Sequence, residues 1–241
     1  MARPVVGLIG GSGLQDPGFI QEPELKAVET PYGAPSGPLS RGHHAAVDLV
    51  FLPRHGPDHR IPPHRVNHRA NLWALKSAGA TSILATASSG SLKKTIRPGS
   101  FVIPDDFVAF WSIPTYHDED VLHVTPGLDA GLRDILATAA KAAGASARNR
   151  GVYVQTTGPR LETPAEVAHF ATLGDVVGMT MASEATLANE LGVRYAAVCS
   201  VDNYCNGIVE RPLTFDQIRA TQERNRAALV RIVTAAVEGM L

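Results

Sequence analysis

TTGPRLETPAE (residues 156–166) and GMTMASEA (residues 178–185) are the densest parts of the stretch that decides the fold, residues 151–203. In the first segment, Thr163–Pro164–Ala165–Glu166 combines a capping residue, a proline at the first helical position and an acid in the first turn. This combination is typical of the start of a helix. The second segment leads into SEATLANELG, which we predict to be a helix that ends at Gly192.

Three apolar runs in the same stretch are predicted to be strands. They are GVYV, DVVGM and VRYAAVCSV, and they lead to Glu162, to Met179–Thr180 and to Asn203. In open α/β sheets, ligands bind at the edge where the strands end. We therefore expect these residues to lie together at one edge of a sheet.

The rest of the chain continues the alternation of strands and helices. The predicted strands are residues 4–10, 47–53, 81–87 and 101–109, the last broken by Pro104. SSGSL (residues 88–92) is predicted to be a small-residue loop at the end of the third of these strands. The predicted helices are residues 65–79, 127–143 and 214–240. Residues 110–126 show no periodicity, and no repeat, low-complexity tract or long linker divides residues 1–241. We therefore expect a single α/β domain with a mostly parallel sheet covered by helices.

Composition excludes several classes of protein. The net charge is −1 and no run of five basic residues exists, which argues against nucleic-acid binding. The apolar run near the N-terminus is too short to span a membrane and has no signal-peptide cleavage site behind it. Cys199 and Cys205 lack the spacing of a metal site, and we interpret them as reduced thiols. These features favour a cytoplasmic protein without a nucleic-acid or membrane partner.

The glycine-rich segment GGSGL (residues 10–14) follows the first predicted strand. It can bring backbone N–H groups and the Ser12 hydroxyl against an anion, although an ordinary turn at a strand end has a similar composition. The third glycine of the dinucleotide fingerprint is missing, so we expect no nicotinamide cofactor.

Four histidines in one segment superficially suggest a metal site. They are His55, His59, His64 and His68, at spacings of four, five and four. Pro62–Pro63 interrupts any helix that would align them, and neither an HExxH motif nor cysteine ligands accompany them. We therefore predict no metal.

Seven segments occur in order between residues 7 and 204: GLIGGSGL, PYGAPS, PRHG, NLWALKSAGA, GPRLET, GMTMASEA and YAAVCSVDNY. On these segments the chain resembles the purine nucleoside phosphorylase and methylthioadenosine phosphorylase family over nearly its whole length. The resemblance implies a three-layer α/β/α fold whose mixed central sheet is partly closed. It also implies a homotrimer or homohexamer that uses inorganic phosphate as co-substrate and no cofactor.

The resemblance also implies a phosphate site. The positions that match the family's phosphate-binding residues are Ser12, Arg54, His55, Ala87, Ser88 and Thr180. Taken alone, Arg54 could be a surface arginine, but its place between a strand end and a glycine, together with the resemblance, favours phosphate binding. The family often has threonine where this chain has Ala87, and the Ser88 hydroxyl could replace that donor.

Base recognition is predicted from Glu162 and Asn203. A carboxylate only accepts hydrogen bonds, so Glu162 suits the donor at ring nitrogen 1 of a 6-oxopurine and opposes adenine. Asn203 can serve nitrogen 7 and the 6-oxygen together, an interaction that strengthens as charge develops on the leaving base. Adenine-specific relatives carry Asp in place of Asn203 and a small residue in place of Glu162. Glu162 alone is also consistent with an acid at the N-terminus of the following helix.

Four further residues are predicted to contact the nucleoside on the basis of the resemblance. Met179 would lie along the sugar, and His123 would reach the 5′ end of the sugar in a neighbouring subunit. Phe215 would favour an apolar methylthio group there, although both Met179 and Phe215 also suit simple packing. Cys205 replaces a carboxylate of adenine-specific relatives. The predicted catalytic residues are Asn203, Glu162 and His55.

The sequence therefore predicts phosphorolysis of 6-oxopurine nucleosides (inosine, guanosine or 5′-methylthioinosine) to free base and pentose 1-phosphate, as in purine salvage. Such a reaction needs no metal or covalent nucleophile, because positioning and electrostatics lower most of the barrier. The alternatives are a methylthioadenosine phosphorylase, a hydrolytic nucleosidase, and a nucleotide sensor that has kept the pocket without catalysis.

Overall fold

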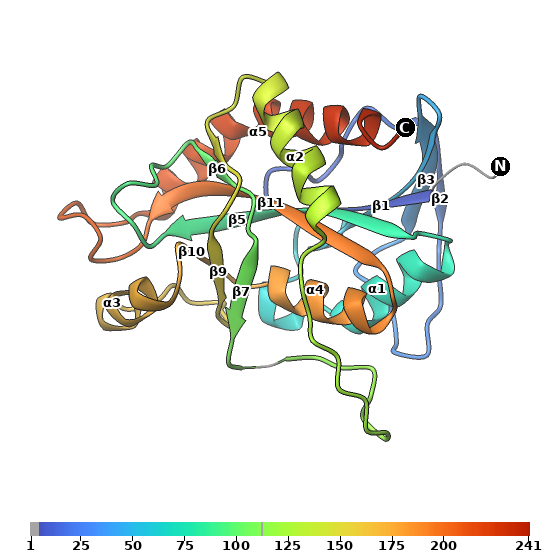
Figure 1. The fold of residues 1–241 in the computed structure, drawn as a ribbon, viewed down its shortest axis with the longest axis horizontal. Helices are drawn as coiled ribbons and strands as arrows, with labels where there is room; N and C mark the ends of the chain where they lie inside the picture. The colour runs from blue at the N-terminus through green and yellow to red at the C-terminus, as the bar shows by residue number, and fades with distance from the viewer. Residues whose placement is uncertain (1–4, 112) are drawn as a thin grey trace.

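The computed structural model describes residues 5–111 and 113–241. The fold is organised around a mixed sheet with helices packed against it (Figure 1). One path of neighbouring strands runs β2 (Gln21–Lys26), β3 (Leu39–His44), β4 (Val47–Pro53), β1 (Val5–Gly10), β5 (Ser82–Ser91), β10 (Val176–Gly178), β9 (Val152–Gln155) and β7 (Asp106–Ala109). A branch leaves β5 through β11 (Arg194–Tyr204), β6 (Phe101–Val102) and β8 (Ala147–Arg148).

Helices cover both faces of the sheet, which gives three layers (Figure 1). One face is covered by α1 (His68–Ser77) and α4 (Met181–Glu190), the other by α2 (Ala130–Ala142) and α5 (Phe215–Glu238). The apolar side chains accordingly form two large buried clusters, one under each pair of helices. The short helix α3 (Pro164–Leu173) packs beside β9, and a 3₁₀ turn, Pro63–Arg65, precedes α1.

The sheet stays open. Within the described residues, β2, β7 and β8 each pair with one neighbour and not with one another. β2 is exposed along its whole length and β8 is exposed as well. The three-layer mixed fold is confirmed, but the partial closure that the resemblance implied is absent, because closure requires the edge strands to pair.

Most predicted elements are present, and the main differences concern β1, β2 and β5. β1 begins at Val5, and Pro4 lies outside the described residues. β2 was missed, because its sequence QEPELK carries no apolar alternation and is entirely exposed. β5 continues through residues 88–91, which we had predicted to be a loop; there residues 89–91 are buried and pair with β11, while Ser88 is half-buried. None of the helices in the described residues combines the length and apolar character that crossing a membrane requires.

A gap in strand pairing beside β5 positions the site. On one side of β5, pairing with β1 stops at Ala85, and pairing with β10 starts at Gly90. On the other side, β11 pairs with β5 along its full length. Among the residues that the structure describes, the backbone of residues 86–89 therefore has one edge without a strand partner, and such an edge leaves polar backbone groups for other partners.

Candidate active site

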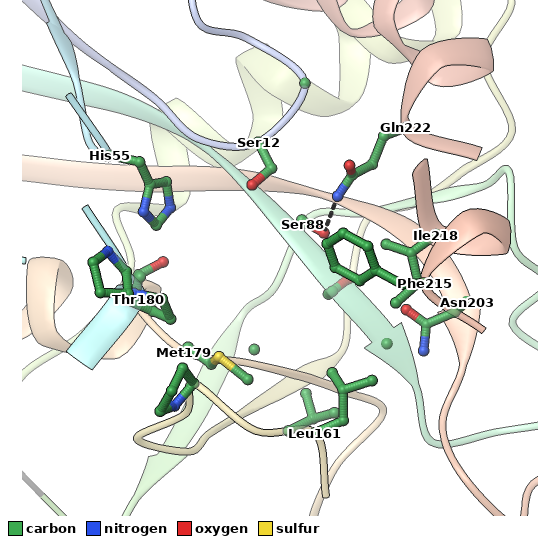
Figure 2. Close-up of a pocket in the computed structure, with 18 of the residues that line it drawn as sticks. Ser12, His55, Ser88, Leu161, Met179, Thr180, Asn203, Phe215, Ile218 and Gln222 are labelled. Atoms are coloured by element: carbon green, nitrogen blue, oxygen red, sulfur yellow. Dashed lines mark hydrogen bonds between the residues drawn. The ribbon is translucent and has the colours of Figure 1, made fainter. Parts of the chain in front are cut away.

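A cavity of about 560 Å³ lies beside this gap, within the size range of small-molecule sites. Its walls come from the loops after β1 and β4, the ends of β5, β10 and β11, the loop before α3, and the start of α5. Figure 2 shows side chains from these separate segments directed into one space. Ten predicted site residues line it: Ser12, Arg54, His55, Ser88, Glu162, Met179, Thr180, Asn203, Cys205 and Phe215.

Arg54 lies at the floor of the cavity and is almost completely buried, at 1% exposure. Its Nε and Nη2 atoms donate to the two carboxylate oxygens of Glu184 on α4, at 2.5 and 2.9 Å, and its Nη1 donates to the Thr86 carbonyl at 2.7 Å. Burial alone would lower the pKa of Arg54, but the facing carboxylate outweighs it and raises that pKa. The guanidinium is therefore a fixed positive charge with one N–H left on each terminal nitrogen.

Two residues that we had not singled out make this arrangement possible. Glu184 supplies the counter-charge, and a Cβ at Gly11 would meet Arg54 Nη1 at 2.3 Å, so this position requires glycine. Although burial opposes ionisation of Glu184, Arg54 holds its pKa below the ordinary value. The signal was present in GMTMASEA, but a helical glutamate is usually a solvated surface residue.

The N-terminus of α4 lies at the cavity, where Thr180 contributes to the lining together with Arg54. The helix begins after Thr180, whose side chain makes no capping hydrogen bond. Gln155 performs the capping instead, because its Oε1 accepts from the Ala182 and Ser183 backbone N–H groups at 2.8 and 3.2 Å. The Thr180 hydroxyl therefore remains available to a ligand, at a helix end that favours negative charge.

Ser12 and two histidines complete this end. The Ser12 hydroxyl lies 3.2 Å from His59 Nε2, a cavity-lining residue that we had considered only as a metal ligand. His55 Nδ1 lies 2.8 Å from the Ile61 carbonyl oxygen. Burial, reinforced by Arg54, lowers the pKa of His55 to about 4. His55 is then neutral at pH 7 with its proton on Nδ1, so Nε2 is an acceptor and the ring adds no positive charge to the site.

Ser88 and Ala87 differ in placement although they are neighbours in β5. Ser88 lines the cavity, whereas the Ala87 side chain is buried in the core on the α1 and α4 side. Successive side chains of a strand alternate between faces, so only the backbone of Ala87 is left for the phosphate-binding role that the resemblance implied. The Ser88 hydroxyl donates to Asp202 Oδ2 at 2.5 Å and so does not replace the missing threonine donor.

Glu162 lines the cavity near Cys205 and Asn206 and is 7% exposed. Its Oε1 accepts from the Thr156 hydroxyl at 2.7 Å, and its backbone carbonyl accepts from Asn206 at 2.8 Å. Its Oε2 has no hydrogen bond to the described part of the chain and can accept from a ligand. The following helix is capped by Thr163 and Glu166 in a reciprocal capping box, so Glu162 is not its cap.

Asn203 sits beside Cys205 at the end of β11, across the cavity from Met179 (Figure 2). One N–H of its amide donates to the Tyr204 carbonyl at 3.0 Å, which leaves one N–H and the amide oxygen for a ligand. A Cβ at Gly90 would meet Cys205 Sγ at 2.5 Å and Asn203 Nδ2 at 3.1 Å, so glycine makes room for both side chains. Burial, reinforced by Glu162, raises the pKa of Cys205 and keeps it a neutral thiol.

Apolar side chains occupy the remaining wall. Met179 and Leu161 lie on one side of the space, and Phe215 and Ile218 of α5 on another (Figure 2). Phe215 is 62% exposed despite lining the cavity, so it is not a packed core residue. His123 is exposed in the irregular segment between β7 and α2 and does not line the cavity of its own chain.

The other two histidines of the cluster, His64 and His68, line a smaller cavity of about 210 Å³ next to the first. In the described residues, no group of three or more His, Cys, Asp or Glu side chains is arranged to hold a metal ion.

Comparison with known proteins shows which proteins this chain is similar to. The chain is 39% identical to a probable 6-oxopurine nucleoside phosphorylase of Archaeoglobus fulgidus, over 97% of this chain and 96% of the relative. It is 42% identical to a probable S-methyl-5′-thioinosine phosphorylase of Methanothermobacter thermautotrophicus, over 98% and 84%. A solved methylthioadenosine phosphorylase from Schistosoma mansoni, in complex with adenine, superposes with a TM-score of 0.90 at 31% identity, covering 99% of this chain and 92% of that one.

The sequence model of the phosphorylase superfamily matches residues 5–238, which is nearly the whole chain. The match confirms the resemblance that the ordered motifs indicated. The solved phosphorylase shares the fold of this chain. The chain therefore belongs to the phosphorylase superfamily.

Proposed function

We propose that the protein cleaves the N-glycosidic bond of 6-oxopurine nucleosides with inorganic phosphate, giving the free purine and pentose 1-phosphate. One observation carries this proposal: a carboxylate and a side-chain amide, Glu162 and Asn203, line the same cavity as the cationic floor at Arg54. A purine and a phosphate can therefore be held on either side of one pentose. The relatives named as 6-oxopurine nucleoside and methylthioinosine phosphorylases support the same reaction and a role in purine salvage.

At the phosphate end, we assign binding to Arg54, Thr180 and Ser12. The remaining N–H groups of Arg54 and the Thr180 hydroxyl are donors, and the α4 N-terminus adds a favourable partial charge. We assign His55 a different role from the cationic one that a phosphate ligand suggests. Its neutral ring presents an acceptor at Nε2, which suits a hydroxyl of protonated phosphate or of the pentose.

At the base end, Glu162 Oε2 accepts from nitrogen 1 of the oxopurine, while the remaining N–H of the Asn203 amide is shared between two acceptors, nitrogen 7 and the 6-oxygen. The bond to the anomeric carbon breaks as phosphate attacks from the other side, and the electron pair moves onto the purine. Hydrogen bonds to the purine strengthen as that charge grows, so they stabilise the transition state more than the substrate. No protein nucleophile takes part in this step, and phosphate is the co-substrate.

Within this class, the apolar wall formed by Met179, Leu161, Phe215 and Ile218 favours a methylthio group at the 5′ position over a hydroxyl. We therefore place 5′-methylthioinosine ahead of inosine and guanosine. The competing candidate is methylthioadenosine, which the similarity to methylthioadenosine phosphorylases supports. Glu162 opposes it, because adenine presents an acceptor at nitrogen 1 to a group that also only accepts.

The decisive experiment measures product formation from methylthioinosine, inosine, guanosine and methylthioadenosine, each with and without phosphate. We expect oxopurine release that requires phosphate and yields pentose 1-phosphate. Full turnover without phosphate would indicate a hydrolytic nucleosidase, and binding without product would indicate a sensor. A preference for methylthioadenosine would refute the role assigned to Glu162.

Variants at the base end test the same assignment. Glu162→Ser combined with Asn203→Asp should shift the ratio of kcat/KM values toward the aminopurine, because the acceptor facing nitrogen 1 is lost and the new carboxylate can accept from the 6-amino group. The matched control is Glu210→Gln, an exposed carboxylate outside the cavity, which should leave the ratio unchanged. An unchanged ratio in the double variant would remove the assignment.

We also expect a homotrimer or homohexamer in the cytoplasm. The irregular segment between β7 and α2 exposes several large apolar side chains, as a subunit interface would require: Phe110, Trp111, Ile113, Val121, Leu122 and Val124. His123 lies in the same segment, which agrees with a contact to a neighbouring subunit. Both cysteines are free, as expected in a reducing compartment. Light scattering coupled to size-exclusion chromatography measures the subunit number.

A further inference from the structure

Ser88 connects the cavity to a buried carboxylate that the proposed mechanism does not use. Asp202 is 1% exposed and lies at a bulge of β11, where the pairing with β5 shifts between Val201 and Asn203. The bulge directs Asn203 into the cavity and leaves Asp202 beside the two serines that face each other across the strands, Ser88 and Ser200.

The hydrogen bonds of Ser88 determine what this residue offers a ligand. A serine hydroxyl has one proton, and Ser88 donates it to Asp202 Oδ2 at 2.5 Å. The Ser88 oxygen accepts from Gln222 Nε2 at 3.1 Å, the contact drawn as a dashed line in Figure 2. With its proton held by Asp202, Ser88 turns only a lone pair toward the cavity, and a lone pair repels an anion.

The surroundings of Asp202 make it able to take up a proton. The neighbouring groups from the packed elements are all neutral: the hydroxyls of Ser88 on β5 and Ser200 on β11, and the amides of Gln222 and Asn225 on α5. The titratable group that interacts with it is the buried Cys199 thiol on β11, which is neutral because burial raises its pKa. Burial likewise raises the pKa of Asp202 to about 6, against the lowering effect of its hydrogen bonds.

We propose that Asp202 is a positioning residue for phosphate: when an anion occupies the cavity, Asp202 binds a proton and thereby turns Ser88 into a donor to that anion. The proton comes from solvent and binds Asp202 Oδ2, which then donates to the Ser88 oxygen. The Ser88 proton rotates toward the anion, while Gln222 keeps donating to the same oxygen. Every hydrogen-bonding site of Ser88 is then satisfied, and no bond between heavier atoms changes.

This inference rests on the proposed function, because that function makes phosphate the anion. It predicts that anion binding is coupled to proton uptake. Below about pH 6, Asp202 already carries its proton in the free protein, so anion affinity is high and independent of this group. As pH rises above that value, each binding event must take up a proton, and the dissociation constant rises toward tenfold per pH unit.

The test is calorimetric titration of the whole protein with sulfate. Sulfate keeps one charge state over the working range, unlike phosphate, so any proton uptake belongs to the protein. Measurements in two buffers of different ionisation enthalpy count the protons. We expect uptake approaching one proton per sulfate near pH 8 and little uptake near pH 5.5, from the position of the Asp202 pKa.

Asp202→Asn is the decisive variant, because its amide donates to Ser88 permanently. Proton uptake should vanish, and sulfate should bind at about pH 8 roughly 10- to 100-fold more tightly than to the parent protein, as linkage to a group titrating near pH 6 requires. Asp216→Asn on exposed α5 surface is the matched control for loss of one charge and should change neither quantity.

Two further variants keep the test decisive. His59 also lies at the cavity, and burial, reinforced by Arg54, lowers its pKa, so His59→Gln should leave the proton uptake intact if Asp202 is the source. Ser88→Ala should abolish the uptake while affinity stays weak at every pH. It therefore substitutes for Asp202→Asn if that variant does not fold.

The inference is overturned if the parent protein binds no sulfate, if it binds sulfate without proton uptake, or if Asp202→Asn retains the same uptake. Failure of the proposed function looks different. Sulfate binding linked to Asp202 could persist in a protein that releases no purine from any nucleoside, and phosphorolysis could proceed without any proton linkage at Asp202.

Discussion

Glu184 and Asp202 are two buried carboxylates near the same cavity, and they behave in opposite ways. Glu184, on α4, faces the Arg54 guanidinium, and its pKa lies below the ordinary value. Asp202, on β11, faces only hydroxyl and amide donors among its hydrogen-bond partners, and its pKa is raised to about 6. Burial opposes ionisation of both groups. The comparison teaches that the charge of the partner, rather than the depth of burial, decides whether a carboxylate here is permanent or titrating.

Removing the carboxylate of Glu184 should have the largest effect. Glu184→Gln leaves Arg54 buried without a counter-charge, and breaking a buried pair from one side costs about 3–5 kcal/mol of the free energy of unfolding. Urea denaturation near neutral pH measures the loss, and phosphate use should fall with it. Glu223→Gln, an exposed position on α5, serves as control. A decrease in the free energy of unfolding below about 1 kcal/mol would show that the Arg54–Glu184 ion pair contributes little to stability.

Asp202→Asn should increase the free energy of unfolding at high pH, whereas Glu184→Gln decreases it. The folded-state pKa of about 6 lies above the ordinary value of 3.8, so the folded protein binds this proton more tightly than the unfolded chain does. The stability contributed by the protonated group is complete at low pH and is lost as pH rises through about 6. The variant should therefore be more stable than the parent by up to about 3 kcal/mol near pH 8.

The same pair of proteins provides the control for that prediction. Near pH 4 Asp202 is protonated in the folded protein, so the two unfolding curves should almost coincide. A constant difference between the two proteins at both pH values would mean that Asp202 does not titrate in this interval.

Tyr195→Phe should have an intermediate effect, because it removes a neutral donor from Glu184 and leaves the guanidinium in place. The Tyr195 hydroxyl donates to Glu184 Oε2 at 2.8 Å. We expect a loss of about 1–2 kcal/mol in thermal or urea unfolding, the range for a buried hydrogen bond to a charged group. A loss as large as that of Glu184→Gln would contradict the dominance of the charged partner.

His68→Phe should have the smallest effect. His68 Nδ1 lies 3.8 Å from Glu184 Oε1 and is buried without a hydrogen bond to the described residues. Burial lowers the pKa of His68 to about 4, so the ring is neutral at pH 7 and adds no charge to the pair. The variant should stay within about 1 kcal/mol of the parent near neutral pH, measured by urea denaturation. A larger loss of stability would show that His68 contributes to the Arg54–Glu184 ion pair.

Several site residues were identifiable from the sequence because strand ends and helix starts leave local signals. Glu162, Thr180 and Asn203 follow apolar runs or precede capping segments, and the structure brings all three to one cavity. Ala87 and Ser88 were not separable in this way. The predicted loop is a strand, and its alternation buries one of the two side chains in the core.

The sequence did not identify the residues that form hydrogen bonds with these site residues, because those contacts join distant parts of the chain. Gln155, Glu184 and Asp202 act on residues 27, 130 and 114 positions away, and no local pattern encodes such contacts. Each also reads locally as something ordinary: a strand-end glutamine, a helical glutamate, an aspartate after a strand.

The sequence by itself determined the alternation of strands and helices, the family, and the residue types that suit the proposed purine and anion. These properties follow from spacing and local conformational preference, which neighbouring residues set together. The tertiary structure decided which donors and charges remain available for a ligand. In the folded protein, Arg54 donates to Glu184, Gln155 caps the N-terminus of α4, and Ser88 donates its proton to Asp202. A side chain has a fixed number of hydrogen-bonding sites, and only the packed neighbours determine which of them are left for a ligand.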